Sequence, residues 1–101
     1  MSTVEDDIQA KGLTAPRVLP AQIEALKERV TYITVTRPDN TTSTFVHAYL
    51  DGKFYLATGF SACVSEANYD EAIGFKLAKA KAEAAAVDKL WELEGYRLYN
   101  A

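Results

Sequence analysis

The sequence predicts an α+β fold in which a three-stranded antiparallel sheet packs against a long C-terminal helix and a shorter N-terminal helix. Three runs between residues 30 and 60 alternate apolar and polar side chains with a period of two, which is typical of strands. Asp51 and Gly52 stand between the second and third runs, and this pair favours a tight hairpin because a type I′ turn needs positive φ at both central positions. Residues 69 to 93 then carry apolar side chains at helical spacing.

The length of 101 residues fits one domain. Residues 1–15 are weakly patterned and form a separate N-terminal segment whose sequence allows a short helix, so the predicted domain spans residues 16–101. Pro20 suits the first turn of a helix, and Ile23 and Leu26 follow at helical spacing. The expected order of elements is therefore α-β-β-β-α.

The three strand-like runs place aromatic side chains at alternating positions. Residues 30–37, 44–50 and 53–60 are the predicted strands, and residues 37–43 form a turn-rich loop between the first two. Aliphatic residues such as Ile33, Val35 and Val46 occupy the positions between the aromatic ones and are expected to face the core. We expect five side chains to share the sheet face that points away from the core: Tyr32, Phe45, His47, Tyr49 and Tyr55.

The long helix is predicted to run from about Tyr69 to Leu93. Asn68 is a favourable N-cap, and Glu71 three residues later completes a capping-box pattern. Gly95 is the expected stop, because helices commonly end before a glycine.

This helix has two apolar faces. The first, here called the narrow stripe, recurs at alternating steps of four and three residues and is expected to face the core: Ile73, Leu77, Ala80, Ala84, Val87 and Trp91. The second, called the alanine face, lies on roughly the opposite side: Phe75, Ala78, Ala82, Ala85 and Ala86. Alanine permits close approach of helices, so Phe75, Ala78, Ala82 and Ala85 are the predicted seam of a homo-oligomer, most simply a two-fold dimer.

Charge and cysteine content argue against a nucleic-acid binder and against a disulfide-stabilised protein. Three of the 14 acidic residues lie at positions 5–7, so the chain from residue 11 on holds 11 basic and 11 acidic side chains. That balance argues against a dedicated nucleic-acid binder. A single cysteine cannot form an internal disulfide, which favours a reducing, cytoplasmic setting. We see no apolar run that predicts a signal peptide or a membrane span.

Cys63 is the one candidate nucleophile or metal ligand of note. A catalytic cysteine needs a general base, and the single histidine, His47, lies in the middle of a predicted strand. One cysteine and one histidine also cannot complete a tetrahedral zinc site. We therefore predict a structural thiol at a strand–helix joint, no catalytic residues, no metal and no cofactor.

Two ordered motifs surround this joint. Gly59, Ser61, Ala62, Cys63 and Val64 end the third strand, and Asn68, Tyr69 and Asp70 open the long helix. Trp91, Leu93, Glu94, Gly95 and Tyr96 close it. Together with residues 16–26 and 31–35, this set resembles a family of tailed-phage and prophage proteins, the gene product forty-nine / sixty-six type. The resemblance spans residues 16–99.

The resemblance implies a phage accessory protein made inside a bacterial host, in a family without an established enzymatic activity. Two positions depart from the family pattern. Phe60 stands where the joint usually has glutamate, and the usual Asn-Gly-Phe hairpin is replaced by residues 51–54. The missing charge at the joint weakens any catalytic role there.

We therefore expect a non-enzymatic protein that binds a host or phage macromolecule in the host cytoplasm, with the aromatic sheet face as the contact surface. One alternative is a nucleic-acid-binding accessory protein, because the element order is that of double-stranded RNA-binding domains; Arg37, Lys76 and Lys79 would then matter. Another alternative is a small-molecule or nucleotide sponge that uses the same aromatic face.

Overall fold

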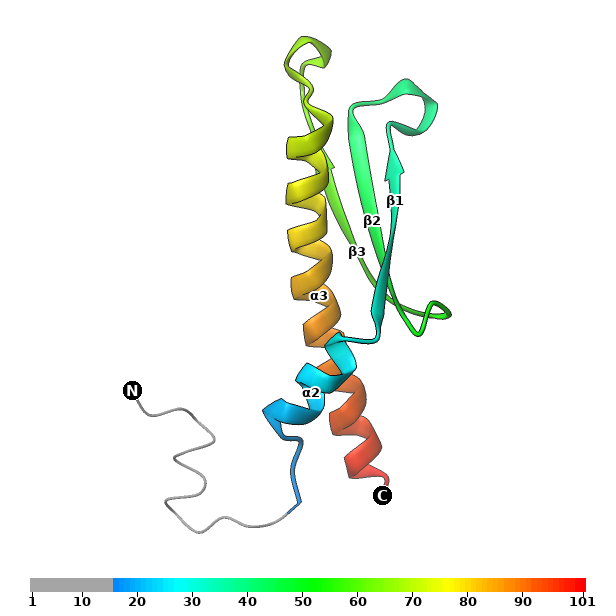
Figure 1. The fold of residues 1–101 in the computed structure, drawn as a ribbon, viewed down its shortest axis with the longest axis vertical. Coiled ribbons are helices and arrows are strands. Elements are labelled where there is room, and N and C mark those ends of the chain that lie inside the picture. Colours follow the sequence, from blue (N-terminus) through cyan, green and yellow to red (C-terminus); the bar gives the residue numbers. More distant parts are fainter. Residues whose placement is uncertain (1–15) are drawn as a thin grey trace, which may run out of the picture.

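The computed structural model describes residues 16–101 and confirms the α+β fold with the order α-β-β-β-α (Figure 1). The predicted segment of residues 1–15 lies outside the described residues. The helices and strands are α2 (Pro20–Lys27), β1 (Val30–Thr36), β2 (Ser43–Leu50), β3 (Phe54–Ala62) and α3 (Glu71–Tyr99), with short 3₁₀ turns η1 (Pro38–Asn40) and η2 (Glu66–Asn68).

The sheet is an antiparallel meander in the order β1-β2-β3, as the sequence predicts. The β2–β3 hairpin turns at Asp51 and Gly52, which have φ of 57° and 71°. The amide of Lys53 donates to the carbonyl of Leu50 at 3.1 Å and closes the turn. Aspartate and glycine tolerate positive φ better than most residues, so this local sequence sets the register of the hairpin.

A β-bulge interrupts the pairing of β2 with β3. Tyr49 pairs with Tyr55, whereas Ala48 pairs with Ala57, which leaves Leu56 as the extra residue on β3. Leu56 is buried, and Ala57 also packs against the core. Because the bulge shifts the alternation by one residue, side chains after Ala57 lie on the opposite face from the one that simple alternation predicts.

The ends of α3 differ from the prediction. Its N-cap is Asp70, whose carboxylate accepts from the amide of Ile73 at 3.1 Å. The predicted N-cap Asn68 belongs instead to η2. The helix also continues through Gly95, because a helical glycine costs only about 1 kcal/mol relative to alanine and the turns beyond it add further hydrogen bonds. Asn100 ends the helix, its side-chain amide donating to the carbonyl of Tyr96 at 2.9 Å.

The two apolar faces of α3 are the reverse of the prediction. Ala78, Ala82 and Ala86 of the alanine face are buried against the sheet. Most of the narrow stripe faces away from it, and Ile73, Leu77 and Trp91 are 60%, 50% and 39% exposed. Val87 is the exception, because it is half-buried and packs against the core beside α2. The reason is the short distance between helix and sheet, which admits small side chains only.

Gly59 marks this close approach. A side chain at that position would overlap the carbonyl of Ala78 and the amide of Ala82. β3 therefore crosses α3 backbone to backbone, with Val46 of β2 filling the space beside it. Glycine is required at position 59 because no larger residue fits.

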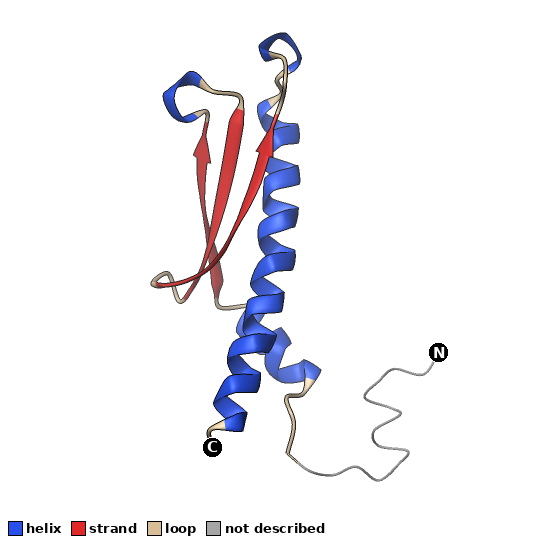
Figure 2. Ribbon diagram, turned by 180° about the vertical axis from the view of Figure 1, so that it is seen from behind, coloured by secondary structure: helices blue, strands red, loops and turns tan. Residues whose placement is uncertain are grey.

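α3 covers one face of the sheet, and α2 lies beside it at the lower end of the strands (Figure 2). α2 packs across the C-terminal half of α3, where Ile23 and Leu90 are almost fully buried. Ala48 and Leu56 complete this part of the core from the strands. The core thus lies on one side of the sheet, in two clusters that both contact Tyr32, and among residues 16–101 no helix covers the other side.

Candidate functional site

The uncovered side of the sheet, here called the outer sheet face, is the candidate site. Four of the five predicted aromatic residues lie on it, since Phe45, His47 and Tyr49 alternate with buried residues of β2 and Tyr55 pairs with Tyr49. The strand pairings place further side chains on this face, and the outer sheet face is defined here by the four aromatic residues and four of these neighbours. Its members are Ile33, Val35, Phe45, His47, Tyr49, Tyr55, Thr58 and Phe60.

The rings on the outer sheet face contact one another. Phe45 and Phe60 pack with ring centroids 5.0 Å apart, and Phe45 stacks on His47 at 6.3 Å. Tyr49 and Tyr55 meet edge to face at 5.8 Å. Contacts of this kind restrict the rotamers of the rings, so less entropy is lost when a second surface covers them.

A short polar network crosses the same face. The hydroxyl of Thr58 lies 2.7 Å from Nδ1 of His47 and 2.7 Å from the hydroxyl of Tyr55. All three groups can donate or accept, so the direction of each hydrogen bond depends on the histidine tautomer. The face therefore combines apolar area with a few adaptable polar groups.

Tyr32 does not belong to this face, and the prediction was wrong for this residue. It pairs with Ala48, whose side chain points toward α3, so the tyrosine ring lies on the helix side of the sheet. There Nζ of Lys79 sits 4.9 Å from the ring centroid. Burial, and to a lesser degree the nearby carboxylate of Glu83, raise the pKa of Tyr32.

The sequence prediction also missed Phe60, Ile33 and Val35. Strict alternation from Tyr55 would turn Phe60 toward the core, and only the bulge at Leu56 brings it beside Phe45. Ile33 and Val35 were expected on the core side because they are aliphatic. They pair with His47 and Phe45 and are 52% and 38% exposed. A predicted bulge in β3 would also have predicted the cross-strand pair of Phe60 with Phe45.

The predicted oligomer seam needs a correction. Ala78 and Ala82 are fully buried within the chain, against Gly59 and Val46, and are not available to a second subunit. Ala85 is half-buried, and Phe75 is 39% exposed near the start of α3. These four residues therefore do not form one accessible surface.

Cys63 lies at the predicted joint, directly after β3. Its thiol donates to the carbonyl of Ser65 at 3.1 Å, and its carbonyl accepts from the hydroxyl of Thr42. A cavity of about 200 Å³ beside it is lined partly by Tyr69 and Gly74 of the helix entry. Within residues 16–101 there is no cluster of three or more His, Cys, Asp or Glu side chains that could hold a metal.

Two basic residues of the nucleic-acid alternative are bonded to acidic ones. Arg37 pairs with Glu66 at 2.7 Å and lies over the ring of Tyr69. Lys79 pairs with Glu83 at 2.6 Å, a contact that raises the pKa of the lysine. Each of these cations thus already has an anionic neighbour in the chain, which reduces its attraction for phosphate.

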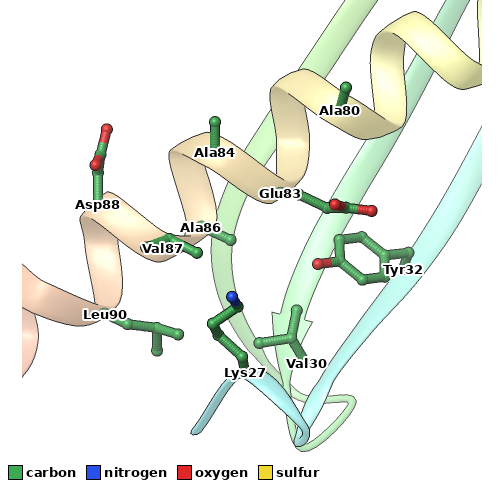
Figure 3. A pocket seen from close by; sticks show the side chains of 10 residues that line it. All are labelled: Lys27, Val30, Tyr32, Ala80, Glu83, Ala84, Ala86, Val87, Asp88 and Leu90. Carbon is green, nitrogen blue, oxygen red and sulfur yellow. The ribbon is translucent and has the colours of Figure 1, made fainter. Parts of the chain in front are cut away.

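A groove separates β1 from the middle of α3 (Figure 3). It encloses about 530 Å³, and Lys27, Val30 and Tyr32 form its lower wall while Glu83 and Val87 approach from the helix. The groove exists because the sheet is close to α3 at β3 but diverges from it at β1, where Tyr32 and Lys79 span the gap.

Together these features define a small α+β protein whose described residues leave one sheet face uncovered and pack the other against an alanine-lined helix. Residues 18–101 match the family described as phage protein (N4 Gp49/phage Sf6 gene 66), and the chain belongs to that family. Comparison with curated proteins found no match, and comparison with solved structures found none either. In the described part of the chain, no helix is long and apolar enough to cross a membrane.

Proposed function

We propose that this phage protein acts without catalysis, by binding a host or phage protein through the outer sheet face in the cytoplasm of the infected bacterium. The observation that carries the proposal is the face itself: eight neighbouring side chains, mostly aromatic or aliphatic, that no helix of residues 16–101 covers. Monomeric soluble proteins rarely leave so continuous an apolar surface exposed without a use for it.

The composition of the face favours a protein partner over a nucleic acid. None of its eight side chains carries a fixed charge. Binding energy at protein interfaces concentrates in a few desolvated aromatic residues, whereas nucleic-acid binding depends on cations facing phosphates. The expected partner therefore offers a flat apolar patch with some hydrogen-bonding groups that meet His47, Thr58 and Tyr55.

The test compares two substitutions of the same type on one strand. Phe60→Glu places a carboxylate on the outer sheet face, next to Phe45. Phe54→Glu is the control, because Phe54 is 54% exposed but points away from the neighbouring Tyr55 and that face. We expect a tagged wild-type protein and the control to capture the same partner from host lysate, and Phe60→Glu to lose it. Thermal melting of both variants checks that the fold persists.

A second variant separates the proposal from its alternatives. If a protein partner binds the outer sheet face, the combined Arg37→Ala, Lys76→Ala and Lys79→Ala variant should still capture it, and the amount captured should vary little between low and physiological salt. Loss of an RNA or DNA partner in this triple variant alone would contradict the proposal and support nucleic-acid binding. A nucleotide that co-purifies, seen in an absorbance scan, would instead support the sponge. If Phe60→Glu changes only the mass of the particle, the outer sheet face is an assembly surface.

A further inference from the structure

The narrow stripe of α3 is a second apolar surface, on the opposite side of the molecule from the outer sheet face. Successive helical residues are about 100° apart, so the stripe is centred roughly 180° from the buried residues Ala78, Ala82 and Ala86. Ala80 and Ala84 of the stripe point away from the strands (Figure 3). Ile73 and Leu77 are at least half exposed. Val87 is half-buried, because one side of it packs against the core beside α2 and lines the groove next to β1, so only its outer side is available to a partner.

The spacing of the stripe indicates what covers it. Its members Ile73, Leu77, Ala80, Ala84, Val87 and Trp91 are separated by steps of 4, 3, 4, 3 and 4 residues. A mean step of about 3.5 residues keeps apolar side chains facing a neighbouring helix along its whole length. A strand or loop has no matching period, so the occupant is a helix of comparable length.

We propose that the occupant is α3 of a second copy of this chain, packed antiparallel about a two-fold axis at residue 82. The spacing of the stripe is symmetric about the level of that residue, whose own side chain is buried against the sheet. Ala80 then meets Ala84 of the copy, Leu77 meets Val87, and Ile73 meets Trp91. A two-fold interface requires such self-complementarity, and alanines at its centre allow the helix axes to approach closely.

Charges beside the stripe favour the antiparallel orientation. In a parallel pair, Lys76 would face Lys81 of the copy and Glu83 would face Asp88, so like charges would meet twice on each side. In the antiparallel pair these contacts do not form.

Near the proposed axis, Lys81 and Glu83 would approach their own copies. Nζ of Lys81 already donates to the carbonyl of Phe60 at 3.1 Å, and Glu83 is bonded to Lys79 at 2.6 Å. These intrachain partners offset both charges in either orientation, so the remaining difference is two like-charged contacts in the antiparallel pair against four in the parallel pair. Opposed helix dipoles also favour the antiparallel pair.

This dimer is independent of the proposed function, and it adds a consequence for it. Each sheet lies on the far side of its own α3, so the dimer presents two outer sheet faces at opposite ends. A particle with two such faces binds a repetitive or dimeric target more tightly than one face does, through effective concentration.

Sedimentation equilibrium of the full chain tests the proposal. We expect a dimer for the wild type at micromolar concentration. Ala84→Glu should weaken dimerisation at least about 30-fold, because it buries a carboxylate without a partner at the seam. Ala72→Glu is the control, since Ala72 is also an exposed alanine of α3 but lies off the stripe; it should leave the dimer intact. Circular dichroism checks the fold of each variant.

Cross-linking tests the orientation in a Cys63→Ser background. A mixture of Ala80→Cys and Ala84→Cys chains should form the mixed disulfide faster than either chain alone forms its own. Preferred cross-linking of Ala84→Cys to itself would overturn the antiparallel arrangement. A wild type that stays monomeric at high micromolar concentration would overturn the dimer. If Ala84→Glu also lowers the melting temperature of that monomer, the stripe is covered within its own chain and the dimer is again overturned.

Discussion

The two faces of α3 carry apolar side chains of very different size, and the smaller ones are inside. Ala78, Ala82 and Ala86 are at most 2% exposed, whereas the larger Ile73 and Leu77 of the narrow stripe face solvent. Apolar area alone would favour the opposite arrangement, because burial of a leucine stabilises a fold more than burial of an alanine does.

Close approach of two backbones explains the difference. β3 meets α3 at Gly59, where there is no room for even a methyl group. A helix can come this near to a sheet only with alanines in the contact, and the short distance gives every contacting atom a dispersion partner. Burial therefore depends on the available distance as well as on hydrophobicity, and large residues then remain for other surfaces.

Filling the tight contact should have the largest effect. Gly59→Ala is expected to destabilise the fold by about 3 kcal/mol or more, because the added methyl group overlaps backbone atoms of α3 that have no rotamer to change. Urea denaturation followed by circular dichroism measures the loss. A variant as stable as the wild type would mean that helix and sheet are further apart than described.

Truncation on the two faces should give unequal effects. Leu90→Ala should cost about 3 kcal/mol, because Leu90 is 1% exposed and contributes to the core beside α2. Trp91→Ala should cost the folded monomer less than Leu90→Ala does, although tryptophan is the larger residue, since Trp91 is 39% exposed and lies on the narrow stripe. Chemical denaturation under conditions where the protein is monomeric measures both. Equal losses would contradict the assignment of the two faces.

A second glycine of the molecule sharpens the argument from Gly59. Gly95 lies in α3, and a side chain added there meets no atom within 4 Å. Gly95→Ala should therefore stabilise the protein by about 0.5–1 kcal/mol, the usual gain in a helix interior. The melting temperature is expected to rise slightly. A fall would indicate that the helix does not continue through this position.

Tyr32 lies on the helix side of β1, and its hydroxyl should make the stability of the fold depend slightly on alkaline pH. Burial raises the pKa of its hydroxyl in the folded state, so the neutral form is favoured there. This contribution to the free energy of unfolding is fully present below the pKa of the unfolded chain, about 10, and is lost as pH rises through the higher folded pKa. Tyr32→Phe should match the wild type at neutral pH and lose less stability above about pH 10. Melting temperatures across that range measure the difference.

Local signals in the sequence were sufficient for the fold. The alternating runs, the Asp51-Gly52 turn and the helical period each depend on near neighbours in the chain, and all three are confirmed. The choice of face on α3 depends on the distance to a sheet formed elsewhere. That distance is set by Gly59, and no periodicity within the helix encodes it.

The outer sheet face was only partly predictable for the same kind of reason. Phe45, His47 and Tyr49 share one strand, and the tight hairpin carries their register to Tyr55. The face on which Tyr32 lies depends on which residues of β1 pair with β2. That register was not predictable, because a longer connection through η1, rather than a tight turn, joins the two strands. The position of Phe60 on the outer sheet face depends on the β-bulge. A bulge is a single inserted residue and has no strong signal in the sequence.

The C-terminal end of α3 extends past the strands and beyond α2 (Figure 1). Among the described residues, Leu93 is the last apolar side chain of the helix that packs against the core, and local contacts such as Arg97 with Glu94 at 2.6 Å hold the last turns. Local unfolding of such a helix end costs less free energy than global unfolding of the domain. Amide hydrogens of these turns should therefore exchange with solvent orders of magnitude faster than those around Ala82, so one continuous helix contains two regions with different lifetimes.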